Sequence, residues 1–415
     1  MLHVSTSDTR GGAARGSFWL HQALCEAGID SVMLVGRKYS DDERVIPMNG
    51  MTARVHERVR DSLDQLPLHG YRKTDESFWT VGWVPRRLST TVEELRPDLV
   101  HLHWMGGGFM PIRALSGLPH PVVWTLRDMW AFTGGCHYTA GCTGYRTRCG
   151  QCPQLNSTRE NDLSRAVWMH KSKAWADLNL WLVPISTWLA RCARRSSLFA
   201  EVPSTVIPNG VDSRRFRPMP SAEARAAWGL APDKRYVLFG AVGPLSDERK
   251  GFGRLAEATR VLAAQCWTTR AELLVFGDYA PDTLPPLGLK TRFLGHIDND
   301  DRLAQLYAGA DVMVVPSLQE AFGKTLIEAM ACGTPVVAFA SGGPMDIVSH
   351  KENGYLARPF DAADLARGID WCLEMPGRTE ELGRKARRRV EEDFDMSIIV
   401  QHYRDLYRSV LGRAK

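Results

Sequence analysis

Short apolar runs alternate along the chain with longer segments in which apolar residues recur every three or four positions. The short runs are typical of buried strands in a parallel sheet, and the longer segments of helices with one apolar face. In the first half we expect strands at 2–5, 31–36, 98–104, 121–128 and 180–186, with a helix over 16–28. In the second half we expect strands at 235–243, 271–278, 291–297, 310–317 and 334–340, with helices over 252–265, 300–310 and 324–333. The alternation predicts an α/β fold in which each half forms a Rossmann-like, doubly wound parallel sheet.

The joint between the halves is expected at 206–224, where an Asn-Gly turn and three prolines interrupt the alternation. A chain of 415 residues is also too long for a single hydrophobic core. We therefore expect an N-terminal domain at 1–207, a C-terminal domain at 208–395 and a final helix at 396–415 that returns to the first domain. Two such domains facing each other across a cleft would form a ligand site.

Composition and charge fit a globular protein without nucleic-acid partners. The chain is 44% hydrophobic and 24% charged, with a formal net charge of +5. Its densest basic stretch, "RKARRR" at 384–389, leads into "VEEDFD" and is typical of a solvated helix face. The start, "MLHVSTSDTRGG", lacks the pattern of a secretory signal, and no apolar run is long enough to span a membrane. With nine cysteines, we expect a cytoplasmic protein.

The segment "QEAFGKTLIEAM" at 319–330 predicts a phosphate site at the start of a helix. Gly323 ends a tight loop, and the free N–H groups and partial positive charge of the following helix favour an anion. Glu320 and Glu328 would lie on either side, where carboxylates accept hydrogen bonds from sugar hydroxyls. An ordinary exposed helix with surface acids is the alternative.

Two other loops carry candidate phosphate ligands. Gly11 and Gly12 follow the first strand, although a plain strand-to-helix turn explains them equally well. Arg249 and Lys250 in "ERKGF" follow the first strand of the second half, where two cations would neutralise a diphosphate; surface charge is the alternative. "FGAVGPLS" offers only G-x-x-G, which disfavours a dinucleotide oxidoreductase.

With these residues assembled, the chain resembles the retaining family 4 glycosyltransferases of the GT-B fold, in particular the capsule and colanic-acid type. The resemblance rests on "NGVD", "RKGF", "YAGADVMVVPSLQEAFGKTLIEAMACGTPVVAF", "GGPMDIV" and "NGYLARPFDAADLA", and in the first half on "TRGGAARGSFWLHQAL" and "VVWTLRDMWAFTGGCHY". It implies transfer of a sugar from a UDP- or GDP-sugar to a hydroxyl group of a glycan or polyprenyl-linked acceptor. It also implies exopolysaccharide synthesis at the inner face of the cytoplasmic membrane.

The resemblance also assigns roles to residues. Glu320 matches the glutamate at the donor sugar and Glu328 the one at the ribose. The diphosphate would contact the backbone of Gly323, Lys324, Thr325 and Leu326, with Gly12 opposite. Arg249 and Lys250 match the cationic pair in part, because many members carry the arginine in a Gly-Arg-Leu where this chain has Gly243-Pro244-Leu245. We expect front-face substitution that needs no divalent metal.

The first-half motif departs from the family at one position, since many members have a histidine where this chain has Arg127 before Asp128. An arginine only donates hydrogen bonds, so we expect Arg127 to steady the donor or its departing phosphate. Loss of a catalytic part is the alternative. It would make the chain a non-catalytic sugar-nucleotide-binding subunit, and a phosphorylase or epimerase on the same fold is another alternative.

Four cysteines, Cys136, Cys142, Cys149 and Cys152, lie within 17 residues. The Cys-x-x-Cys at their end is a good metal knuckle, and four thiolates make a closed zinc site, so we expect a structural zinc ion. Two disulfides or free thiols remain as alternatives, because the spacing before the knuckle is not that of a standard zinc finger.

The acceptor side is expected to include His103, Trp104, Trp130 and His137, all near the ends of first-half strands. Packing inside the domain is the commoner role for such residues. The loop "FLGHIDNDD" at 293–301, with His296 and Ile297, is expected to contact the nucleotide base. The segment "STWLARCARRSSLF" at 186–199 would rest on anionic lipid, or is simply a basic surface helix.

Overall fold

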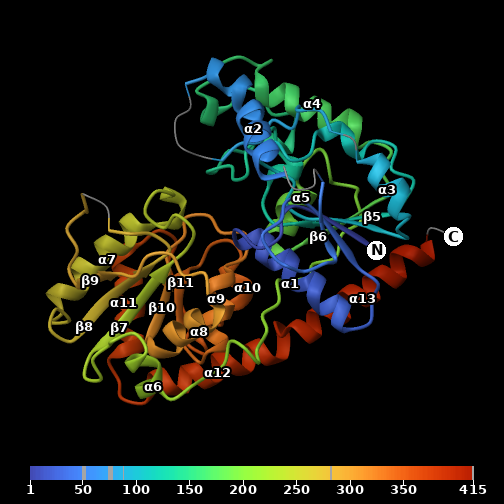
Figure 1. Cartoon of the computed structure of the whole chain (residues 1–415). Coiled ribbons are helices and arrows are strands. Elements are labelled where there is room, and N and C mark those ends of the chain that lie inside the picture. Colours follow the sequence, from blue (N-terminus) through green and yellow to red (C-terminus); the bar gives the residue numbers. More distant parts are fainter. Residues whose placement is uncertain (49–52, 73–77, 87, 281–282, 414–415) are drawn as a thin grey trace. The chain divides into compact units, whose positions relative to one another are not determined.

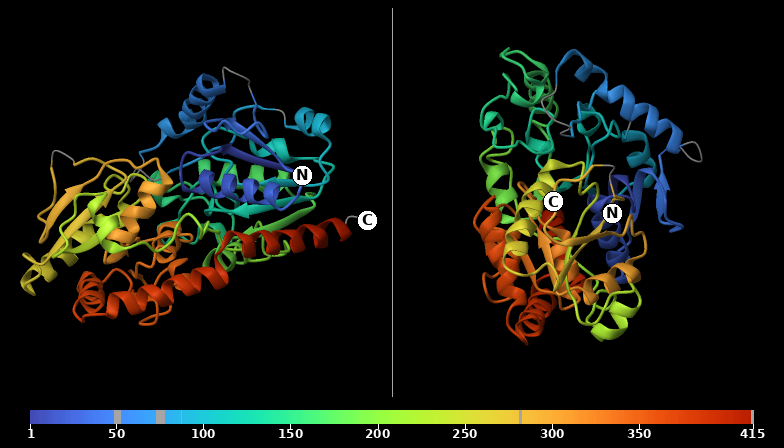
Figure 2. Two further views of the ribbon diagram at one scale, coloured as in Figure 1. Left: turned by 60° about the horizontal axis from the view of Figure 1, so that its bottom comes forward. Right: turned by 90° about the vertical axis from the view of Figure 1, so that its left-hand side faces the viewer.

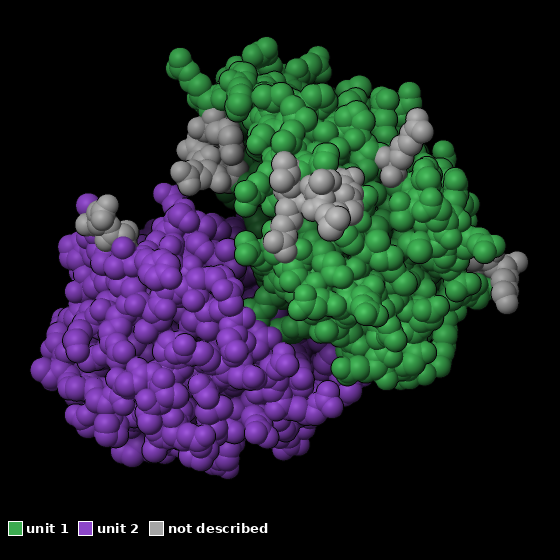
Figure 3. Space-filling view, viewed as in Figure 1, with its two compact units in different colours: residues 1–208, 400–415 green, residues 209–399 purple. Residues whose placement is uncertain are grey.

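The computed structural model describes residues 1–48, 53–72, 78–86, 88–280 and 283–413. It divides into two compact units (Figure 3). Unit 1 comprises Met1–Pro208 and Val400–Lys415, and unit 2 comprises Asn209–Ile399. Each unit has its own parallel sheet (Figure 1).

Unit 1 is built on a six-stranded parallel sheet in the order β3-β2-β1-β4-β5-β6. Its strands are β1 (Leu2–Ser7), β2 (Val32–Arg37), β3 (Val45–Pro47), β4 (Val100–Leu102), β5 (Val122–Leu126) and β6 (Leu180–Pro184). Its helices include α1 (Gly12–Glu26), α2 (Ala53–Gln65), α3 (Ser89–Leu95), α4 (Leu163–Ala174) and α5 (Thr187–Arg194). Strands β1, β4 and β5 are buried along their whole length, and the burial includes the polar side chains of His3, Ser5 and His101.

Unit 2 repeats this architecture in the order β12-β11-β10-β7-β8-β9. Its strands are β7 (Arg235–Gly240), β8 (Ala271–Phe276), β9 (Lys290–Phe293), β10 (Val312–Val315), β11 (Val336–Phe339) and β12 (Gly354–Ala357). Its helices include α6 (Ser221–Ala226), α7 (Phe252–Ala264), α8 (Asp300–Gly309), α9 (Lys324–Ala331), α10 (Pro344–Ile347), α11 (Ala362–Leu373) and α12 (Arg378–Asp393). One apolar cluster joins the sheet to α7 and α11 through residues such as Leu255, Val275 and Ile369. The predicted α/β fold with two Rossmann-like parallel sheets is confirmed.

The strand order reverses at one point in each sheet. In unit 1 the reversal lies between β1 and β4, and in unit 2 between β7 and β10. Ligands of doubly wound sheets bind beyond the carboxyl ends of the strands at such a reversal. The loops that begin at Asp8, His103, Ala241 and Pro316 are therefore the places to look for a site.

Helix α13 (Met396–Arg413) follows α12, and its residues from Val400 onward belong to unit 1 (Figure 1, Figure 2). It is attached there by two buried tyrosines. The Tyr403 hydroxyl lies 2.8 Å from Thr125 Oγ1, and the Tyr407 hydroxyl lies 2.8 Å from His101 Nδ1. Both partners are on neighbouring strands of the sheet, β4 and β5, so the helix is held by polar contacts within a buried interface.

Helix α5 is shorter than the basic segment predicted at 186–199, and its apolar side is used inside unit 1. Leu189 is fully buried, whereas Arg191, Arg194 and Arg195 are exposed. Across the described ranges of the chain, no helix has the length and apolar character needed to cross a membrane.

We expect Tyr407→Phe to lower the free energy of unfolding by about 1–3 kcal/mol, because His101 Nδ1 would lose its hydroxyl partner in a buried site. Chemical denaturation would measure the change. The matched control is Tyr279→Phe, since Tyr279 is 74% exposed, and its effect should stay within about 0.5 kcal/mol. Equal effects of the two substitutions would contradict this role for Tyr407.

Candidate functional site

In unit 2, the loops after β7 and β10 are joined by one backbone–backbone hydrogen bond and one from a side chain to the backbone. Leu318 N donates to Arg249 O at 2.8 Å, and Arg249 Nη1 donates to Gln319 O at 3.1 Å. Gly251 has a φ of +75°, and a Cβ atom at this position would lie 1.9 Å from the Pro316 carbonyl oxygen. Only glycine allows so close an approach, which brings the two loops together.

Glu320 lies at this junction and is surrounded by cations, in what we call the Glu320 cluster: Glu320, Lys250, Arg249 and Asp247. Lys250 Nζ is 2.9 Å and Arg249 Nη1 is 3.9 Å from Glu320 Oε2, while Asp247 accepts from Arg249. Burial raises the pKa of the Glu320 carboxyl, but Lys250, Arg249 and the Phe322 backbone N–H outweigh burial, so this pKa is lowered overall. Glu320 is thus an ionised carboxylate, and the cluster joins it to two fixed positive charges.

Helix α9 begins at Lys324, four residues after Glu320, at the predicted phosphate site. Its N-cap, Gly323, has a φ of +103° and therefore requires a residue that tolerates the left-handed region. The Leu326 N–H already donates to the Gly323 carbonyl at 2.9 Å, and the Leu326 side chain is fully buried. The half-buried Lys324 and Thr325 are then the positions in this turn from which backbone N–H groups would meet an anion.

Glu328 lies within α9 and is held by two neighbours. Tyr307 donates its hydroxyl to Glu328 Oε2 at 2.9 Å, and Lys324 Nζ is 3.4 Å from Glu328 Oε1. The Glu328 side chain is only 4% exposed. A carboxylate has about four acceptor positions, so these contacts leave capacity for a ligand hydroxyl.

The predicted base-contacting residues follow β9. His296 is exposed and its Nε2 lies 2.9 Å from Asp298 Oδ1, while Ile297 is half-buried. The preceding Gly295 accepts a backbone hydrogen bond from Gly277, which follows β8. His296 and Ile297 are therefore placed just beyond the carboxyl end of the sheet of unit 2.

In unit 1, Gly11 and Gly12 form the turn between β1 and α1. Both are exposed, and no atom lies within 4 Å of a Cβ built on either residue. Gly11 has a φ of +91° and precedes the first turn of a 15-residue helix. The space above this helix start is therefore open, as an anion site requires.

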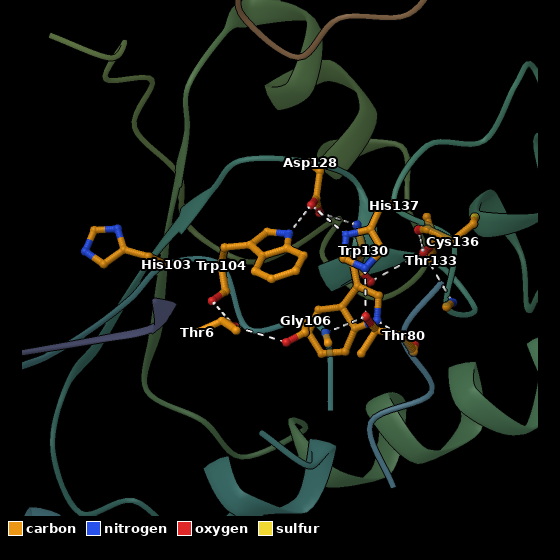
Figure 4. Close-up of polar contacts among 12 residues, drawn as sticks. Thr6, Thr80, His103, Trp104, Gly106, Asp128, Trp130, Thr133, Cys136 and His137 are labelled. Carbon is orange, nitrogen blue, oxygen red and sulfur yellow. Dashed lines mark hydrogen bonds and ion pairs between the residues drawn. The ribbon is translucent and has the colours of Figure 1, made fainter. Parts of the chain in front are cut away.

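Asp128 joins three of the predicted residues of unit 1, Trp104, Trp130 and His137, in what we call the Asp128 network (Figure 4). Its Oδ2 accepts from Trp104 Nε1 at 2.8 Å and lies 2.7 Å from His137 Nδ1, and its Oδ1 accepts from Trp130 N at 2.9 Å. Burial raises the pKa of Asp128, but His137, Trp130 and Trp104 together lower it overall. The network brings three of the four predicted acceptor-side residues together.

Thr80 closes the Asp128 network. Its Oγ1 lies 2.9 Å from His137 Nε2 and accepts from Gly107 N at 3.1 Å, and its carbonyl accepts from Trp130 Nε1 at 2.8 Å. One assignment satisfies all these contacts: Thr80 donates to His137 Nε2, and His137 donates from Nδ1 to Asp128. His137 is then fully engaged inside the unit.

His103 and Arg127 do not join the Asp128 network. His103 Nε2 lies 2.7 Å from His3 Nδ1, and Arg127 Nη2 lies 3.4 Å from His103 Nδ1. All three side chains are buried, and burial lowers the pKa of Arg127 to about 10 and that of both histidines well below the usual range. Arg127 is therefore held in the interior of unit 1, where Tyr403 acts on it electrostatically.

The four cysteines of the predicted zinc site line one cavity in the segment 134–155, the cysteine loop. Within the described part of the chain, one group of three or more potential metal ligands has all its donor atoms within 4.8 Å of one another, namely His3, His101 and His103. The cysteine sulfurs are therefore spaced more widely than in a closed metal site.

The roles of two residues of the site could not be predicted from the sequence. Tyr307 is the residue that fixes Glu328, and Thr80 is the residue that links His137 to the backbone after β4. Tyr307 lies in an apolar helical pattern, in which a tyrosine is commonly a packing residue. Thr80 lies in a loop without any periodic signal, so neither position was distinguishable from its neighbours.

The two halves of the chain match two protein-family models. Residues 10–215 match the model "Glycosyltransferase Family 4", and residues 221–389 match the model "Glycosyl transferases group 1". The first match covers most of unit 1 and the second most of unit 2.

Named relatives share parts of the chain. A D-inositol 3-phosphate glycosyltransferase of Catenulispora acidiphila is 37% identical over 198 residues, which are 44% of this chain and 45% of that protein. An uncharacterized glycosyltransferase of Methanocaldococcus jannaschii is 34% identical over 50% of this chain and 55% of its own. The chain thus covers about half of these relatives. A glycogen synthase of Mycobacterium tuberculosis is 29% identical over 96% of this chain and 91% of its own.

Solved structures share the whole fold. Sucrose-phosphate synthase from Thermosynechococcus elongatus aligns over 99% of both chains with a TM-score of 0.69 and 23% identity. Anabaena Alr3699/HepE, solved in complex with UDP-glucose, aligns over 98% of this chain and 99% of its own, with a TM-score of 0.67 and 20% identity. At these identities the likeness establishes the fold.

We expect Asp128→Asn to lower the free energy of unfolding by about 1–3 kcal/mol at neutral pH. The NH2 group of the asparagine would face N–H donors of the Asp128 network and could not accept hydrogen bonds from them. The pKa of Asp128 is lowered in the folded chain, so its contribution is complete above the unfolded value of about 3.9. It is lost as the pH falls through the folded pKa. Urea denaturation should therefore show a constant difference in the free energy of unfolding between the two proteins down to about pH 4. Below that pH the difference should become smaller. A difference between the two proteins that stays constant well below pH 4 would contradict this role of the Asp128 charge.

Proposed function

Because the chain has the GT-B fold of the group 1 and family 4 glycosyltransferases, we propose that it transfers a hexose from a nucleoside diphosphate sugar to a hydroxyl group of an acceptor. The observation that carries this proposal is the Glu320 cluster beside the start of α9. It combines two fixed cations, a helix start and an ionised carboxylate, which together suit a diphosphate attached to a polyhydroxylated group.

The donor lies with its diphosphate at the start of α9 and at Lys250 and Arg249. Glu320 then accepts hydrogen bonds from hydroxyls of the sugar, and Glu328 does so from those of the ribose. The complex of Anabaena HepE with UDP-glucose supports a nucleotide-sugar donor for a protein of this fold. Within this proposal, His296 and Ile297 contact the base.

The reaction proceeds by front-face substitution with retention at the anomeric carbon. The acceptor hydroxyl attacks from the side of the departing diphosphate, whose oxygen takes the proton. Lys250 and Arg249 hold the charge that develops on the leaving group, so no divalent metal is required. The contribution of the protein is positioning and electrostatic stabilisation.

The acceptor is a glycan or a polyprenyl-linked sugar of an exopolysaccharide pathway, bound by unit 1. Trp104 supports this assignment, because it is half-buried and its indole is oriented by Asp128. Anionic lipid would contact a group of exposed arginines at the end of α5, namely Arg191, Arg194 and the following Arg195. Flotation with anionic but not neutral liposomes would support this contact, and no flotation would end it.

Glu320→Gln should lower kcat by about a hundredfold or more, because the amide keeps the shape but loses the charge that the cluster orients. Lys250→Ala should act in the same direction by removing a cation from the leaving group. Transfer or slow hydrolysis of the donor would be measured with purified protein, and circular dichroism would verify the fold. Near-normal turnover in Glu320→Gln would contradict the assignment.

The matched control is Glu248→Gln, since Glu248 is an exposed glutamate two positions from Lys250. Its turnover should stay close to that of the unsubstituted chain. Activity abolished by EDTA and restored by magnesium would contradict the cation-based account, and inversion at the anomeric carbon in the product would contradict retention.

A screen of UDP, GDP, ADP and their sugar conjugates should identify the donor by a rise in the unfolding temperature. A ligand at about a hundred times its Kd stabilises by about 2.7 kcal/mol. The rise should shrink in Lys250→Ala and persist in Glu248→Gln. If none of these nucleotides shifts the transition, the donor assignment is wrong.

A further inference from the structure

The proposed transfer reaction assigns no function to the four cysteines of the cysteine loop. This loop follows β5 and extends over residues 134–155, with only short 3-10 turns at Gly144–Arg146 and Pro153–Leu155. Loops of this length without regular structure are uncommon in compact domains unless something braces them. Yet Cys152 is buried and Cys136, Cys142 and Cys149 are half-buried, so the loop is folded back on itself.

All four cysteines face a single cavity. Its lining also includes Trp79, Thr133, Gly134, Thr139, Gly144, Tyr145, Gly150, Pro153, Gln154 and Ser164. The φ angles of Cys149, Gly150 and Gln151 are +56°, +96° and +46°, a run of left-handed residues that turns the chain tightly. This turn returns Cys152 to the same cavity as Cys149.

One of the sulfur atoms accepts a hydrogen bond from the backbone, since Gly144 N lies 3.4 Å from Cys142 Sγ. Burial raises the pKa of the Cys149 and Cys152 thiols, and nearby backbone N–H groups oppose this effect only in part. A bound metal ion deprotonates the thiols that coordinate it, and so removes this cost of burial.

A buried lysine lies beside the same loop. Lys171 of α4 is fully buried, and its Nζ donates to the carbonyls of Trp130 and Thr133 and lies 3.9 Å from the centre of the Trp130 ring. Burial lowers the pKa of Lys171 to about 7, whereas negative charge on Cys136 and Cys149 raises it. Four thiolates around a divalent ion leave a net charge of −2, which would favour the ammonium form of Lys171 and be partly offset by it.

We propose that Cys136, Cys142, Cys149 and Cys152 bind one zinc ion as a closed, structural site. Binding releases four thiol protons to solvent and forms four Zn–S bonds of about 2.3 Å, which requires the sulfurs to move inward into the cavity. The site has no position left for a substrate. Its effect is to fix the loop that carries His137, the residue next to Cys136.

The His3, His101 and His103 group is a poorer metal site although its donor atoms are closer together. Both ring nitrogens of His101 lie within hydrogen-bonding distance of hydroxyls, those of Thr125 and Tyr407. Arg127 lies 3.4 Å from His103, so a positive charge already lies next to the three histidines. The positive charge of Arg127 would oppose the binding of a metal ion.

The test measures the metal content of the full-length chain, purified under reducing conditions without added zinc. We expect about one equivalent of zinc per chain, and less than about 0.3 equivalents in Cys152→Ser. The matched control is Cys266→Ser, since Cys266 is exposed and lies outside the loop, and it should retain the full equivalent. Less than about 0.3 equivalents in the unsubstituted chain would overturn the proposal.

A second measurement covers the case in which Cys152→Ser fails to fold. A mercurial reagent added to the unsubstituted chain, with a zinc-sensitive dye present, should release zinc in step with the loss of four thiols. Zinc that leaves before any thiol reacts would overturn the cysteine assignment. So would an intact mass that shows disulfides within the loop, or iron with sulfide in place of zinc.

Discussion

The approach of Gly251 to Pro316 is the constraint on which the Glu320 cluster depends. Strands β7 and β10 are neighbours in the sheet, so the loops that follow them leave the same edge side by side. A side chain at position 251 would collide with the Pro316 carbonyl and separate the loops. Because there is none, the backbones of Arg249 and Leu318 meet, and Lys250 reaches Glu320. Two cations and a carboxylate are then held together by backbone geometry.

In unit 1, the loops after two neighbouring strands are also held together, but by a side chain and not by a glycine. Trp104 follows β4 and Asp128 follows β5, and these strands are also neighbours. The Asp128 carboxylate accepts from the loop after β4 through Trp104, from its own loop through Trp130, and from the cysteine loop through His137. The loops at the edge of the sheet are thus coupled through one buried charge, whose ionised form is favoured by its three donors.

Features that arise from a local pattern can be predicted from the sequence. The buried strands β1, β5, β7 and β10 and the helices α7, α8 and α9 follow from apolar periodicity, and the start of α9 follows from Gly323. Strands β3 and β12 do not, because they are short edge strands of three and four residues without a distinctive apolar run. The partners within the site are equally hidden. Nothing local links Thr80 to His137 or Tyr307 to Glu328, since these contacts join segments 57 and 21 residues apart.

The hydrogen bond between Tyr307 and Glu328 has a consequence for recognition. The carboxylate is fixed in one rotamer by a buried hydroxyl on α8 and by Lys324 one turn away on its own helix. A polyhydroxylated molecule that binds to Glu328 therefore finds a hydrogen-bond acceptor whose side chain was already immobilised when unit 2 folded. Immobilising such a side chain during association costs about 0.5–1.5 kcal/mol, and preorganisation removes this cost from the binding step.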